Sequence, residues 1–185
     1  MALNRYFAQL EEQIVDRFKA NASQTSSRDE LSVHTGIKDP VLLEEIIELG
    51  IPPEGLIAFR IYPLVMVAWA SEGVDANERE AIRRVASRLG ISSESVARIL
   101  VDHWTRRPPP KLCMDAWKRY CRHLFSKMSH QSAQQLIDLT RTQMQEIAGA
   151  SGGILGFNKT SNKEALRIKQ MIDEMDRCLA LNASK

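Results

Sequence analysis

The residues with the clearest spacing for chemistry are glycines, a lysine and a threonine near the end of the chain. From Gly153 the segment GGILGFNKTSNKE (152–164) reads G-x-x-x-x-N-K-T, one residue away from the phosphate-binding loop G-x-x-x-x-G-K-[ST]. Such a loop needs a buried strand before it, whereas the preceding TQMQEIAGAS continues a helical pattern. Ser161 and Glu164 instead form S-x-x-E, a capping box that satisfies exposed amides at a helix start. We therefore interpret the segment as a glycine-rich entrance to a helix, anchored by Ile154, Leu155 and Phe157.

A second capping box lies earlier in the chain. Asp75 and Glu78 are spaced D-x-x-E and follow Val74, just as Thr160 precedes Ser161. Acidic side chains in a first turn are favoured by the helix dipole, so both residues have a structural reason to be there. Each box follows an apolar helix and a loop. The sequence therefore predicts a weak internal two-fold repeat of helix, loop and capped helix.

Side chains that perform nucleophilic catalysis show no comparable spacing. Catalysis of that kind needs a serine or cysteine beside a positioned base. No signature neighbours surround the four histidines, His34, His103, His123 and His130. No C-x-x-C spacing links the three cysteines, Cys113, Cys121 and Cys178, which we expect to be reduced thiols of a helical core. The sequence therefore predicts a non-enzyme. The alternative is a hydrolase with an unrecognised site, which a polar pocket joining His103, Cys113 or acids would favour.

The elements that must position these side chains are helices. Helical periodicity recurs along the chain, and no segment of useful length alternates apolar and polar residues. The segment from Ile61 is apolar on every side, which predicts a buried central helix kinked or restarted at Pro63. Gly50 and Gly90, each followed by isoleucine, are typical of helix stops. The sequence predicts an all-α fold, a compact bundle of about eight helices.

Composition restricts the classes of function. The 185 residues carry a net charge of +2, which argues against a strongly basic nucleic-acid binder. The longest apolar run, 61–70, is half of the ~20 residues that a membrane span needs. The first residues include Glu11, Glu12 and Asp16, unlike a secretory signal. We expect a cytoplasmic protein without a membrane span.

Two segments carry a resemblance to a known family. YPLVMVAWASEGVDANEREAI (62–82), followed later by GGILGFNKTSNKEA, resembles the tellurite-resistance TerB-like family of all-helical bacterial domains. Ser71 stands where the family has aspartate, and Glu72 where it has glycine, with Gly73 available for the turn. The resemblance implies a TerB-like helical domain over 51–185. Residues 1–50 are then an N-terminal helical extension with a polar linker at 21–35.

The resemblance also implies a class of function. Members of the family are associated with stress responses, are not known as enzymes, and have been suspected of binding divalent metals through loop acids. The matching acids here are Glu72, Asp75 and Glu78. Oxygen-rich, flexible sites suit a cation such as calcium or manganese. The resemblance thus implies a non-enzymatic binding or sensing module, and no other cofactor is expected.

A basic segment offers a second kind of site. Residues 103–127 hold seven bases and one acid, whereas residues 38–80 hold nine acids and three bases. An ordinary solvated helix face explains this pattern, as does a docking surface for an acidic protein or for the acidic region of a second copy in a homodimer. Nucleic acid is the least favoured partner. The candidate docking residues are Trp104, Arg106, Arg107, Lys118, Arg119 and Arg122. Trp104 also shares an apolar face with Leu100, which favours core packing.

Overall fold

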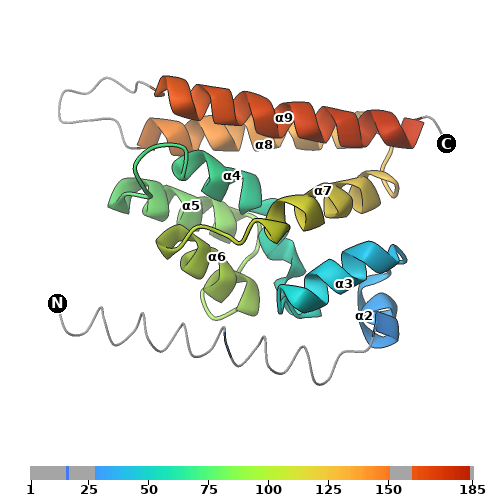
Figure 1. The fold of residues 1–185 in the computed structure, drawn as a ribbon. Helices are drawn as coiled ribbons and strands as arrows, with labels where there is room; N and C mark the ends of the chain where they lie inside the picture. The colour runs from blue at the N-terminus through green and yellow to red at the C-terminus, as the bar shows by residue number, and fades with distance from the viewer. Residues whose placement is uncertain (1–15, 17–27, 151–159, 184–185) are drawn as a thin grey trace.

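The computed structural model describes residue 16 and residues 28–150 and 160–183 (Figure 1). Within those residues there is no strand, and the elements are eight α-helices and one 3-10 helix. In order they are α2 (Arg28–Thr35), α3 (Pro40–Glu48), η1 (Pro53–Arg60), α4 (Tyr62–Ala68), α5 (Ala76–Arg88), α6 (Val96–Arg106), α7 (Leu112–Phe125), α8 (His130–Ala150) and α9 (Asn162–Ala183). The predicted all-α bundle is confirmed. The TerB-like assignment and the internal repeat stay predictions.

Helix α4 lies at the centre of the bundle. It contacts η1, α5, α6, α8 and α9, and the long helices α8 and α9 lie side by side over it (Figure 1). Leu64, Val65 and Val67 are fully buried, which explains why this segment is apolar on every side. Pro63 falls in the first turn, where the missing N–H costs no helical hydrogen bond. The chain therefore restarts at this proline after η1, as predicted.

Two glycines end helices α3 and α5. Gly50 and Gly90 have φ of 64° and 80°, a left-handed conformation that glycine adopts without a Cβ penalty. The following isoleucines fold back, since Ile51 N donates to Ile46 O at 3.1 Å and Ile91 N to Ala86 O at 3.0 Å. Both predicted helix stops are confirmed.

Helix α2 corrects the predicted linker. Residues 28–35 lie inside the proposed polar linker 21–35, yet they form a helix. Leu31 supplies the apolar contact because its side chain is 2% exposed, and Ser32 Oγ donates to Ile37 O at 2.6 Å. Asp29 and Glu30 lie in the first turn, where acidic side chains interact favourably with the helix dipole. One buried leucine in a polar stretch gives too weak a periodicity to be recognised in the sequence.

The segment before residue 51 shares the core of the rest of the chain. Leu42 and Ile46 of α3 are fully buried, and α3 packs against α7. One apolar cluster extends from Leu31 to Leu179. Helix α6 begins at Val96, because the side chain of Ser95 accepts from Arg98 N and caps it. The anchors Ile154, Leu155 and Phe157 lie outside the described residues, as do residues 1–27 of the proposed N-terminal extension apart from residue 16.

Candidate functional site

The starts of helices α5 and α9 face one another across a groove. Residues 71–75 and 161–163 line this open groove, which has a volume of about 690 Å³; we call it the entrance groove. Figure 1 shows the first turns of both helices at the same end of the bundle. Asp75 and Ser161 are far apart in the sequence, so the groove exists only through tertiary packing of α5 on α8 and of α8 on α9.

Both predicted capping boxes are present at this groove. Asp75 Oδ1 accepts from Glu78 N at 2.8 Å, and Glu78 Oε2 accepts from Asp75 N at 2.9 Å. Ser161 Oγ accepts from Glu164 N at 3.2 Å, and Glu164 Oε2 accepts from Ser161 N at 2.6 Å. Glu78 is 1% exposed and Glu164 is 3% exposed. The two glutamates are therefore buried structural groups that fix the backbone on either side of the groove.

The loop before α5 brings acidic groups to solvent. Gly73 has φ of 135°, a backbone conformation that residues with a side chain rarely adopt. A Cβ at this position would lie 3.8 Å from the ring of Trp69. The turn leaves Glu72 and Asp75 exposed at the groove. Lys163 reaches the groove from α9 and places one cation near the two carboxylates.

The predicted metal ligands are only partly brought together. Glu72 and Asp75 line the groove, whereas Glu78 points inward to its capping bond. Across the described ranges, no three His, Cys, Asp or Glu side chains are grouped as a ligand set. Glu78 is therefore removed from the predicted set of metal ligands, because its carboxylate is buried and accepts the capping hydrogen bond from Asp75 N. Asn162 and Lys163 were missed by sequence reasoning, since nothing local indicates that α9 starts beside α5.

The capping boxes give a stability prediction. Glu78→Ala and Glu164→Ala should each lower the free energy of unfolding by about 0.5–2 kcal/mol, because each leaves a helix-start amide without its acceptor. Urea denaturation followed by circular dichroism measures the change. Glu80→Ala, at an exposed position of the same helix, is the matched control. Equal stability of all three variants would contradict the structural role of the boxes.

The predicted docking residues do not form one face. Trp104 is 3% exposed, and its ring centroid lies 6.2 Å from that of Phe59 and 6.0 Å from that of Tyr62. Its carbonyl oxygen accepts from Trp69 Nε1 at 2.8 Å. Trp104 is therefore a core residue, and we remove it from the predicted set of docking residues. Its apolar spacing with Leu100 had already indicated this.

The basic residues of that set divide between two places. Arg106 and Arg107 lie exposed at the end of α6. The other three lie on α7, where Lys118 Nζ is 3.7 Å from Asp115 Oδ1 and Arg119 Nε donates to Glu45 Oε1 at 3.1 Å. The opposed charges of the two segments are thus partly paired within the chain, through the packing of α3 on α7.

A second groove lies at the end of α7. It encloses about 320 Å³, and we call it the α7 groove; it is lined by Asp39, Arg119, Arg122, His123, Ser126, Leu181 and Asn182. Partial burial lowers the pKa of His123, Lys127 lowers it further, and Asp39 opposes the shift. Burial and Lys127 therefore favour the neutral form of the imidazole. Sequence reasoning missed Asp39, His123 and Asn182, which three separate helices bring together.

His103 and Cys113 do share a pocket, the arrangement that would favour a hydrolase. The other lining residues are Leu49, Ile51, Leu100, Trp104 and Pro110. The volume is about 30 Å³, room for two or three water molecules at about 10–15 Å³ each. Cys113 is 1% exposed. The pocket as it stands has no room for a substrate beside the thiol.

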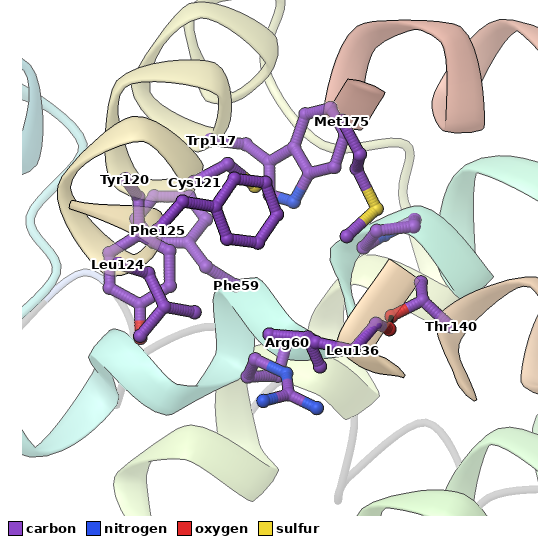
Figure 2. Close-up of a pocket in the computed structure, with 11 residues that line it drawn as sticks. Phe59, Arg60, Trp117, Tyr120, Cys121, Leu124, Phe125, Leu136, Thr140 and Met175 are labelled. Carbon is purple, nitrogen blue, oxygen red and sulfur yellow. Dashed lines mark hydrogen bonds between the residues drawn. The ribbon is translucent and has the colours of Figure 1, made fainter. Parts of the chain in front are cut away.

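A charged residue also lies at the edge of the aromatic core. Arg60 is half-buried and lines a small pocket with Phe59, Tyr120 and Phe125, and Figure 2 shows its side chain beside that of Leu136. Burial lowers the pKa of Arg60 and raises the pKa of Tyr120, and their mutual electrostatic interaction opposes both shifts. The cavity beside them is about 10 Å³, the space of a single water molecule. This is a packed junction with one charged group, and an arginine within an apolar run was its signal in the sequence.

Comparisons of the chain with protein-family models, curated proteins and solved structures give no match. No helix among the described residues is both long and apolar enough to span a membrane. The function must therefore be inferred from the residues that line the grooves.

Proposed function

We propose that the chain is a non-enzymatic, cytosolic binding or sensing module of TerB-like type, linked to stress response, with the entrance groove as its ligand site. The observation that supports the proposal is that two loops remote in sequence, 71–75 and 161–163, line one groove of about 690 Å³. Buried capping boxes hold the start of each helix, so the walls of the groove are fixed while its polar side chains face solvent.

A divalent cation is the ligand we propose for this groove. The carboxylates of Glu72 and Asp75 and the side-chain oxygens of Ser161 and Asn162 line the groove and would supply oxygen donors of the kind that calcium and manganese accept. Only two carboxylates contribute, and Lys163 opposes a cation. We therefore expect weak binding, with Kd of about 10⁻⁴–10⁻³ M as for low-affinity calcium modules.

Tryptophan emission provides the test. Trp69 is half-buried beside Gly73, so cation binding at the loop should change its emission. At a metal concentration about tenfold above Kd, mass action stabilises the fold by about 1.4 kcal/mol. That corresponds to a rise in Tm of about 3–6 °C for a chain of this size. Calcium and manganese titrations, read by emission and by thermal melting, measure both effects.

The matched variants separate binding from folding. Glu72→Gln with Asp75→Asn removes both charges but keeps an N-cap, because asparagine caps as well as aspartate. This variant should melt like the wild type without metal and lose the metal response. Glu48→Gln, an exposed acid on α3, is the control and should respond like the wild type. The highest metal concentration should be about 10 mM, roughly tenfold above the weakest expected Kd. No change in emission or Tm at that concentration, or an equal change in the double variant, would overturn the proposal.

Docking of an acidic partner is the second candidate function. The specific observation that favours it is the α7 groove, where Arg122 has no hydrogen bond or ion pair from its guanidinium to any described residue. A homodimer that uses the acidic region of a second copy is one version of this candidate.

A further inference from the structure

Arg122 lines the α7 groove with a guanidinium that makes no hydrogen bond or ion pair to a described residue. Its backbone oxygen accepts from Asn182 Nδ2 at 3.0 Å, while no described residue pairs with its guanidinium. Arg119, one turn earlier, is held by Glu45 at 3.1 Å. Of the two arginines in the α7 groove, one is therefore neutralised within the chain and the other faces the groove as a free cation.

The walls of the α7 groove are fixed by polar contacts. Cys178 Sγ donates to Lys118 O at 3.4 Å, and Asn182 donates to Arg122 O at 3.0 Å. Both contacts have the same sequence offset, so α9 runs parallel to α7 at this end. Asp39 Oδ1 accepts from Val41 N and Leu42 N, which fixes the start of α3. A groove held in this way is preorganised, and little ordering cost opposes binding.

The charges around the groove select an anion. Arg122 lies on one side, and Lys127 lies close to His123, whose pKa it lowers. Arginine binds a carboxylate or a phosphate with paired N–H donors, and such charge-assisted bonds are stronger than neutral ones. His123 and Asn182 add neutral polar groups at the wall.

Two further residues distinguish a carboxylate on a peptide from a phosphate. Asp39 lies in the wall and would repel a phosphate dianion more strongly than a single carboxylate. Its second oxygen accepts no hydrogen bond from a described residue and suits a peptide N–H. Leu181 is 55% exposed at the rim and offers an apolar contact. We propose that the α7 groove binds an acidic peptide segment of a partner protein, with a glutamate or aspartate carboxylate on Arg122 and an apolar side chain on Leu181.

Fluorescence anisotropy with a defined probe tests the proposal. The probe is a fluorescein-labelled peptide of alternating glutamate and leucine, titrated with the full chain at low salt. Arg122→Gln should weaken binding about tenfold, the loss of one charge-assisted contact, and Leu181→Asn should weaken it by a smaller factor. Affinity should also fall as sodium chloride is raised, because the contact is electrostatic.

The control removes an equal charge elsewhere. Lys169→Gln, at an exposed position of α9 outside both grooves and about 20 Å from Asn182 at ~1.5 Å per residue, should bind the probe like the wild type. Arg122→Gln should melt like the wild type because its guanidinium makes no hydrogen bond or ion pair with a described residue. If it does not, Arg122→Lys replaces it and should show an intermediate loss of binding. No probe binding at millimolar-order protein, or equal binding by Arg122→Gln, would overturn the proposal. Tighter Arg122-dependent binding of inorganic phosphate than of the probe would overturn it in favour of a phosphate site.

Discussion

Trp104→Ala is expected to lower the free energy of unfolding by about 3–5 kcal/mol, the usual cost of removing a buried aromatic side chain. The indole is 3% exposed and packs edge-on against Tyr62, with ring planes at 83°. Its loss leaves a cavity where η1, α4 and α6 meet, and the surrounding helices can collapse into it only partly. For a chain of 185 residues the expected fall in Tm is about 6–20 °C.

The control for Trp104 is a large apolar residue on the surface. Leu166 is 58% exposed, so Leu166→Ala should change the free energy of unfolding by about 0.5 kcal/mol or less. Chemical denaturation of both variants measures the difference. Equal small effects would show that Trp104 is accessible after all, and would restore it to the docking set.

The second large effect is expected at the ion pair between α3 and α7. Arg119→Ala should lower the free energy of unfolding by about 3 kcal/mol, because it leaves the carboxylate of Glu45 buried without its cation. The side chain of Glu45 is 11% exposed, and its Oε2 already has no hydrogen-bond partner. The side chain of Arg119 is 31% exposed, so water can solvate it when the partner is removed.

This difference in exposure makes the prediction asymmetric. Glu45→Gln keeps an acceptor for Arg119 Nε and removes the buried charge, so its cost should be about 1 kcal/mol. Combining Glu45→Gln with Arg119→Ala should recover part of the loss caused by Arg119→Ala alone. Urea denaturation of the three variants measures the coupling. Additive effects would contradict a direct pair between α3 and α7.

The local features of the fold were predictable from the sequence, and their juxtaposition was not. Apolar periodicity predicted the central helix α4, and the spacing of Asp75 and Glu78 predicted the capped start of helix α5. Both signals lie within a few consecutive helical turns of the sequence. Helix α2 escaped prediction because a single buried leucine, Leu31, holds it to the core. Local sequence carries no information about which partner an amphipathic face will meet.

The same reasoning applies to the candidate sites. The sequence placed Glu72 and Asp75 on a loop but could not show that Asn162 and Lys163 face them. It grouped the basic residues by position in the chain, whereas the structure pairs Arg119 with Glu45 and leaves Arg122 in the α7 groove. Residues joined by tertiary packing across tens of positions have no common local signal.

Helix α9 connects the two grooves. Its first turn lines the entrance groove and its last turn lines the α7 groove. The entrance groove carries the exposed carboxylates of Glu72 and Asp75, and the α7 groove carries the guanidinium of Arg122, which pairs with no described residue. The two sites can therefore be tested separately, by cations at one end and by acidic peptides at the other.

Paramagnetic broadening by manganese tests most directly whether residues 71–75 and 161–163 form one cation site. Substoichiometric Mn²⁺ added to the ¹⁵N-labelled chain should broaden the amide signals of both loops together, and Ca²⁺ in excess should restore them. The signals of the α7 groove, about 28 Å away along α9 at ~1.5 Å per residue, should stay sharp. Broadening of only one loop, broadening centred elsewhere, or no broadening at all would contradict the proposed site.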